Sequence, residues 1–101
     1  MKISILLPYK ENFSIEKSGA VSLFVNDIIK NSSEKNLFTV YGKTDEKKFL
    51  DKNYVNLKFR NNFLRSNSNI YINKFLEHEK KISSDIIEIH NRPAYVKKNK
   101  E

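Results

Sequence analysis

Two short apolar runs, residues 2–7 and 85–90, constrain the fold of this chain more than any other feature. Each run is rich in isoleucine, the first also in leucine, and is nearly continuous in apolar side chains. This pattern is typical of a strand that is buried on both faces. Strands of that kind belong mainly to parallel sheets covered by helices, so the two runs predict an α/β fold.

Residues 20–30 and 66–83 have the apolar spacing of helices. In the first helix we expect the buried face to consist of Val21, Phe24, Val25 and Ile28. The opposite, solvated face is expected to carry Ser22, Asn26 and Lys30. Two further strands are predicted at residues 37–41, which precede Gly42, and at residues 54–59.

The resulting order, β-α-β-β-α-β, predicts a Rossmann-like domain with a mainly parallel sheet and right-handed crossovers. We expect the fourth strand to return beside the first, on the side away from the second and third. The loop at residues 8–19 and the residues that follow the fourth strand would then converge at the carboxyl edge of the sheet. Ligands of such sheets bind at this edge, where the strand order reverses.

Composition excludes several classes of protein. The chain has 101 residues, 39% of them hydrophobic and 31% charged, which indicates one domain with a small core. Its 19 basic and 12 acidic residues give a net charge of +7, but only three of the cations are arginines and the lysines are scattered, so we expect no nucleic-acid partner. There is no cysteine and no apolar run of the roughly 20 residues that a membrane span needs, and we expect a cytoplasmic protein.

Gly19 and His90 are the candidate site residues. Gly19 precedes the first helix, whose free N–H groups and dipole would favour an anion, although a simple turn into the helix explains a lone glycine better. His90 follows the fourth strand and leads into Asn91 and Arg92, where it would position a substrate group or cap the next loop. Glu88 lies two residues earlier, on the same face, where it would orient the imidazole, although a solvated or salt-bridged carboxylate is the more common role of such a residue.

Other familiar sites find no support. The two glycines of the chain are too few for the dinucleotide-binding fingerprint, and the histidines form no recognisable set of metal ligands, so no metal is expected. Gly42, Lys43 and Thr44 match the end of a Walker A loop, but position 37 is leucine where the motif needs glycine. A turn after a strand explains these three residues better.

Several segments together resemble the amino-terminal domain of family 4 glycosyltransferases, which are retaining enzymes of the GT-B fold. The resemblance extends over nearly the whole chain and rests chiefly on residues 85–93, with the sequence DIIEIHNRP. The opening strand with Pro8, the loop to Ser18-Gly19-Ala20 and the segment LFTVYG at residues 37–42 add to it. Ala20 departs from the family, in which many members have a second glycine at this place.

The resemblance implies an enzyme that transfers a sugar from a nucleotide-sugar to a cell-envelope or polysaccharide acceptor, often a lipid-linked one, with retention and without a metal. By the same resemblance Gly19 lies beside the donor diphosphate and His90 near the transferred sugar, as the candidate catalytic residue. Asn91 and Arg92 occupy the next positions of the motif and are assigned to donor binding. A lipid-linked acceptor would bring the enzyme to the inner face of the membrane.

The resemblance also implies that residues 1–101 are a partial, acceptor-side domain without the second domain, which holds most of the nucleotide-sugar. We therefore expect these residues to be inactive by themselves. The alternative from another class of function is a small anion-binding or regulatory α/β module that uses its lysine-rich surface to hold an acidic partner.

Overall fold

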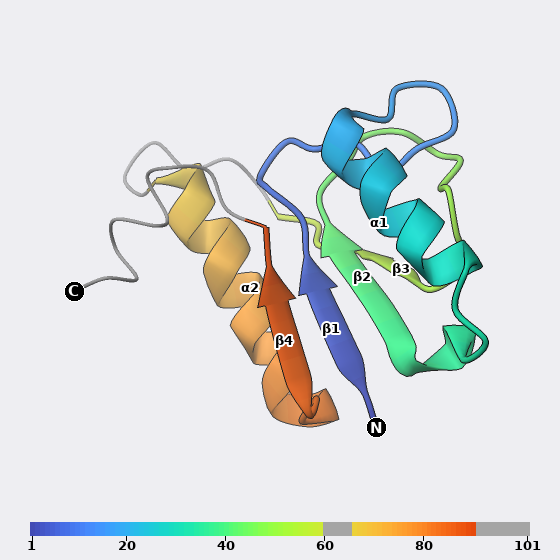
Figure 1. The fold of residues 1–101 in the computed structure, drawn as a ribbon. Coiled ribbons are helices and arrows are strands. Elements are labelled where there is room, and N and C mark those ends of the chain that lie inside the picture. Colours follow the sequence, from blue (N-terminus) through green and yellow to red (C-terminus); the bar gives the residue numbers. More distant parts are fainter. Residues whose placement is uncertain (60–65, 91–101) are drawn as a thin grey trace.

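Four parallel strands form the centre of the fold, in the order β3-β2-β1-β4 (Figure 1). The computed structural model describes residues 1–59 and 66–90. Its elements are β1 (Ile3–Leu6), α1 (Ala20–Lys30), the short 3-10 helix η1 (Lys35–Leu37), β2 (Phe38–Gly42), β3 (Tyr54–Asn56), α2 (Asn67–Ile82) and β4 (Ile86–Ile89). The predicted α/β class, the parallel sheet and the return of the fourth strand to the side of the first are confirmed.

The two helices cover opposite faces of the sheet and divide the core into two clusters. Ile5 of β1 packs with Val25 and Ile29 of α1 on one face. Leu6, the next residue of β1, packs with Tyr71 and Phe75 of α2 on the other. Successive side chains of a strand point to opposite faces, so β1 is buried on both sides, as its apolar run predicts.

The orientation of α1 differs from the prediction. Its buried residues are Ser22, Val25, Asn26 and Ile29. Phe24, expected in the core, is 58% exposed, and Ile28 is 39% exposed. Phe24 lies two residues from both Ser22 and Asn26, and residues two apart point about 200° apart around a helix. Burial of the two polar residues therefore turns Phe24 towards solvent.

The burial of β4 was also predicted wrongly. All four of its residues are exposed, and Ile86, Ile87 and Ile89 each leave close to half of their surface uncovered. The strand pairs with β1 and lies at the edge of the sheet. In Figure 1 α1 lies over the half of the sheet away from β4, so position in the sheet and not apolar content decides how much of this strand is covered.

Candidate functional site

The candidate site lies at the carboxyl edge of the sheet, where β1 is flanked by β2 and β4. Because the strands are parallel, the loop after β1 and the residue after β4 leave the sheet at the same edge. The backbone N–H of His90 donates a hydrogen bond of 2.9 Å to the carbonyl of Leu6, so the chain at His90 is held directly beside the end of β1. The predicted reversal of strand order at this point is therefore present.

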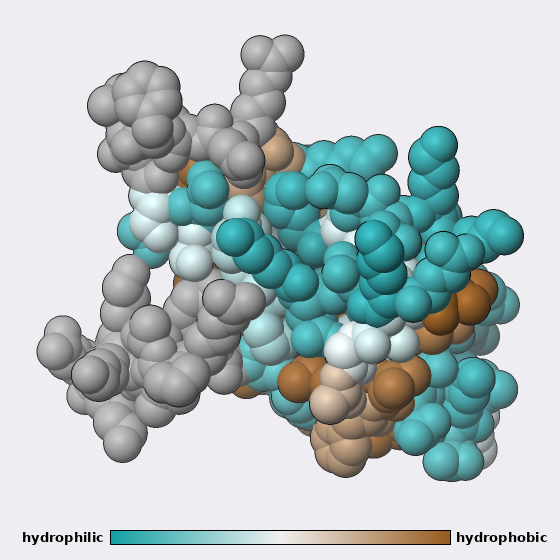
Figure 2. All heavy atoms as spheres, turned by 90° about the horizontal axis from the view of Figure 1, so that it is seen from above, coloured by the Kyte–Doolittle hydropathy of each residue, from teal (hydrophilic) through white to brown (hydrophobic). Residues whose placement is uncertain are grey.

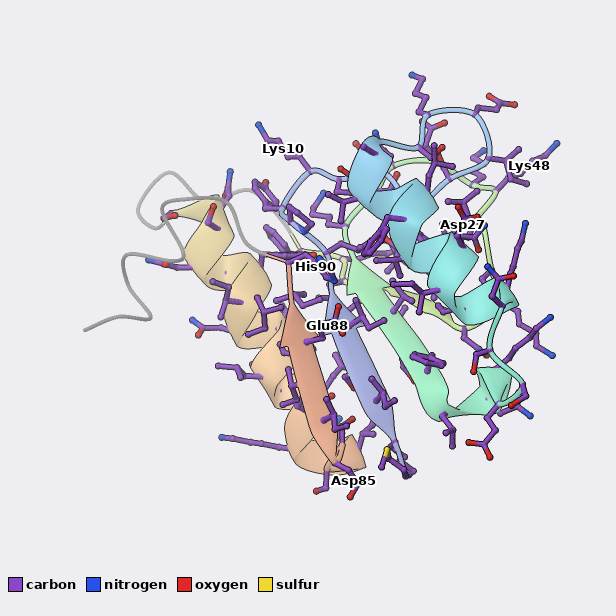
Figure 3. The ribbon with its side chains drawn as sticks, viewed as in Figure 1. Lys10, Asp27, Lys48, Asp85, Glu88 and His90 are labelled. Carbon is purple, nitrogen blue, oxygen red and sulfur yellow. The ribbon has the colours of Figure 1, made fainter. Side chains whose placement is uncertain are left out.

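His90 and Glu88 form a hydrogen-bonded pair on the face of the sheet that α1 covers. Glu88 is the register partner of Ile5, whose side chain packs against α1, and in-register residues of parallel strands share a face. The distance from His90 Nε2 to Glu88 Oε1 is 2.7 Å, and the two side chains are 22% and 49% exposed. Figure 3 shows the pair at the end of β4 beside β1. Glu88 thus occupies the Nε2 nitrogen of the ring and orients the imidazole.

Gly19 is the N-cap of α1, and the Glu11 carboxylate occupies the end of this helix. The Ser22 N–H donates a hydrogen bond of 3.1 Å to Glu11 Oε2. A Cβ placed on Gly19 would lie 2.5 Å from the same oxygen, and its three nearest neighbours would all be atoms of the Glu11 carboxyl group. Gly19 therefore makes room at the end of α1 for a carboxylate of the protein itself.

A tight turn before Glu11 sends neighbouring side chains in different directions. The Glu11 N–H bonds to the carbonyl of Pro8 at 3.1 Å, and Lys10 has a φ of 72°, in the left-handed region. Tyr9 points into the α2 side of the core, where its ring lies 5.4 Å from that of Tyr71. A left-handed conformation costs a residue with a Cβ about 1 kcal/mol, and such strain is concentrated at functional sites. The turn makes Lys10 and Glu11 candidate site residues that the sequence did not reveal.

The carboxyl edge brings Gly19 and His90 to the same side of the sheet, because α1 covers the face on which the His90 ring lies. Asn91 and Arg92, the other two predicted site residues, lie outside the described residues. Within residues 1–59 and 66–90, no group of three or more histidine, cysteine, aspartate or glutamate side chains has the arrangement of a metal site. In the same part of the chain, no helix is long and apolar enough to cross a membrane.

Comparisons with protein-family models, with curated proteins and with solved structures found no match. The α/β fold is therefore the part of the prediction that the structure supports directly. A function for the chain must be argued from its own residues and from the geometry of the carboxyl edge.

Proposed function

We propose that this chain is the acceptor-side, Rossmann-like domain of a retaining GT-B glycosyltransferase. The enzyme would transfer a sugar from a nucleotide-sugar to a cell-envelope or polysaccharide acceptor in the cytoplasm, or at the membrane surface where the acceptor is lipid-linked. The observation that carries this proposal is the placement of the His90–Glu88 pair and the Gly19 loop at one carboxyl edge, beside the strand at which the order reverses. Most contacts to the nucleotide belong, in this proposal, to a second domain.

The His90 side chain would contact the transferred sugar. With Nε2 held by Glu88, Nδ1 accepts a hydrogen bond from a sugar hydroxyl when the ring is neutral and donates one when it is protonated. A ring that is oriented before the substrate binds loses little conformational freedom on binding. Glu88 is then a positioning residue, because it acts on the sugar only through His90.

The end of α1 would lie beside the donor diphosphate. The free N–H groups and the dipole of a helix N-terminus stabilise negative charge, and the Glu11 carboxylate already exploits them. A diphosphate in the position of this carboxylate would have to displace it. The proposal therefore predicts that donor binding changes the environment of the Ser22 N–H.

Nuclear magnetic resonance titration of the ¹⁵N-labelled chain tests this function. UDP-glucose and GDP-mannose are the probes, and UDP and glucose are the controls. We expect a nucleotide-sugar to shift the amide signal of His90 more than either control does, whereas Gly19 and Ser22, assigned to the diphosphate, should also respond to UDP. His90→Ala should weaken the response about tenfold and leave the stability unchanged, whereas His78→Ala, at the other histidine of the chain, should have no effect.

Two outcomes would contradict the proposal. One is an unchanged His90 signal at millimolar concentrations of both nucleotide-sugars. The other is binding of a polyanion such as heparin that weakens steeply with salt, in a chain that does not respond to nucleotide-sugars. The second result would favour the small anion-binding module instead.

A further inference from the structure

A pocket that is separate from the His90–Glu88 pair opens at the carboxyl edge, on the side of β2 and β3. It is a pocket of about 520 Å³, which lies within the range of about 300–1,000 Å³ that is usual for ligand sites. It is lined by residues that follow β2 and by the last residue of β3 with two that come after it, namely Lys43, Thr44, Asp45, Glu46, Lys47, Phe49, Asn56, Lys58 and Phe59. A smaller pocket of about 290 Å³ shares Lys43, Thr44 and Asp45 and extends to Tyr9, Lys10 and Asn12, in the loop after β1. Figure 2 looks onto this edge and shows that it is largely hydrophilic.

Hydrogen bonds hold the wall of the larger pocket in place. The Thr44 N–H donates to Asn56 Oδ1 at 2.9 Å, and Asn56 Nδ2 donates back to the Thr44 carbonyl at 2.8 Å. The Thr44 hydroxyl donates to Asn12 Oδ1 at 2.6 Å and so ties the loop after β2 to the loop after β1. Thr44 is 6% exposed. A wall that is fixed in this way is ready for a ligand, which lowers the entropic cost of binding.

Lys43 places a weakly compensated positive charge in the pocket. Its side chain is only 20% exposed, and its Nζ lies 5.3 Å from the centre of the Phe59 ring. Its ion pair among the described residues is with Asp45, at 3.9 Å, and the Asp45 side chain is 98% exposed. An ion pair that is so long and so solvated offsets little of the charge.

The other lining charges leave the pocket positive. Lys47 and Lys58 form no ion pair within the part of the chain that the structure describes. Glu46 forms an equally long ion pair of 3.9 Å with Lys17, which does not line the pocket, so the wall holds three lysines against two carboxylates. Asp45 extends into solvent. The lysines are therefore the charged groups most available to a ligand, with the rings of Phe49 and Phe59 as apolar walls.

We propose, on the basis of the proposed function, that this pocket binds the phosphate or carboxylate group of an acidic saccharide acceptor. Lys43 contacts the anionic group within the pocket, and Lys58 and Lys47 attract it from the rim. The sugar ring lies against Phe49 and Phe59. The acceptor would then enter beside β2 and β3, while the transferred sugar lies by His90, on the other side of the loop after β1.

Titration calorimetry and amide shifts of the same chain test this assignment without any nucleotide-sugar. The probes are glucose 6-phosphate and glucuronate as acidic sugars, glucose as the neutral sugar, and inorganic phosphate. We expect the acidic sugars to bind most tightly and to shift the amides of Thr44, Asn56 and Phe59. Lys43→Gln should weaken their binding about tenfold, the effect of losing one charge-assisted hydrogen bond at a partly solvated site.

Two further variants make the test specific. Lys58→Gln removes a charge at the rim of the pocket and should weaken binding of the acidic sugars about twofold. Because the Lys58 side chain is exposed, this variant should fold as the parent does. Lys81→Gln removes the same charge from the exposed end of α2, at the opposite edge of the sheet, and should leave binding unchanged.

Equal affinity for glucose and glucose 6-phosphate would overturn the assignment, and so would unchanged binding in Lys43→Gln. Inorganic phosphate that binds as tightly as the acidic sugars would overturn the role of the sugar ring. The proposed function fails separately: acidic sugars that bind the pocket, in a chain whose His90 signal does not respond to nucleotide-sugars, would leave an acidic-saccharide site without glycosyl transfer.

Discussion

Replacement of Gly19 by alanine tests whether the Glu11 carboxylate is bound at the end of α1. The new Cβ would lie 2.5 Å and 2.7 Å from the two carboxylate oxygens, closer than non-bonded atoms approach. The backbone of Gly19, with φ of −87° and ψ of 179°, is open to alanine, so the substitution strains nothing else locally. The carboxylate must therefore move away from the Ser22 N–H.

The expected loss of stability follows from two opposing effects. Loss of a hydrogen bond to a charged group costs about 1.5–3 kcal/mol, and the partial exposure of Glu11 puts the value at the lower end. The smaller freedom of alanine in the unfolded chain returns about 0.4–1 kcal/mol. Gly19→Ala should thus lower the free energy of unfolding by about 1 kcal/mol.

A double-mutant cycle with Glu11→Ala isolates this contact. Once the carboxylate is gone, the new Cβ has lost its nearest neighbours, so in the Glu11→Ala background Gly19→Ala should raise the free energy of unfolding by about 0.4–1 kcal/mol. Urea unfolding followed by circular dichroism measures all four proteins, and Glu16→Ala, an exposed acid of the same loop, is the matched control. Additive effects of the two substitutions, or a Gly19→Ala chain as stable as the parent, would refute the contact.

Two further predictions concern buried hydroxyl groups. The Ser22 hydroxyl is buried without a hydrogen-bond partner among the described residues, so Ser22→Ala should raise the free energy of unfolding by about 1 kcal/mol in the same urea assay; an equal or lower value would contradict this. Burial also raises the pKa of the Tyr54 hydroxyl above its ordinary value of 10.0, so above that pH the folded chain keeps a proton that the unfolded chain has lost. The free energy of unfolding should therefore fall as the pH rises, by about 1.4 kcal/mol at pH 11 from this group alone. Between pH 8 and pH 11, the free energy of unfolding of Tyr54→Phe should therefore fall by about 1.4 kcal/mol less than that of the parent chain. An equal fall in the variant and the parent would show that the hydroxyl is not buried.

The local spacing of apolar residues was sufficient to predict the order of the helices and strands and the parallel sheet. The β-branched runs and the helical spacing predicted every helix and strand of the described residues apart from the short 3-10 helix η1, although β3 ends at Asn56, earlier than expected. These signals are local because a strand or helix is selected by the spacing of apolar side chains over a few residues. The proximity of His90 and Glu88 was also predictable, since residues two apart in a strand share a face.

The face that each element buries was not predictable in the same way. Ser22 and Asn26 are polar, yet they are buried, and Ile86 and Ile87 are apolar, yet they are exposed. Burial depends on which neighbour covers an element, and that is decided by strand order and by the place at which a helix begins. A short segment of sequence does not show which neighbour will cover it.

The sequence by itself determined the α/β class, the parallel sheet and the placement of His90 at the end of a strand, because each follows from periodicity and chain order. Only the tertiary structure decided that the carboxylate of Glu11 occupies the end of α1 and that Lys43 lines a pocket between the segments that follow β2 and β3. The physical reason is distance along the chain. Glu11 and Ser22 are separated by 11 residues, and Thr44 and Asn12 by 32, so these contacts arise only when the sheet brings the loops to one edge.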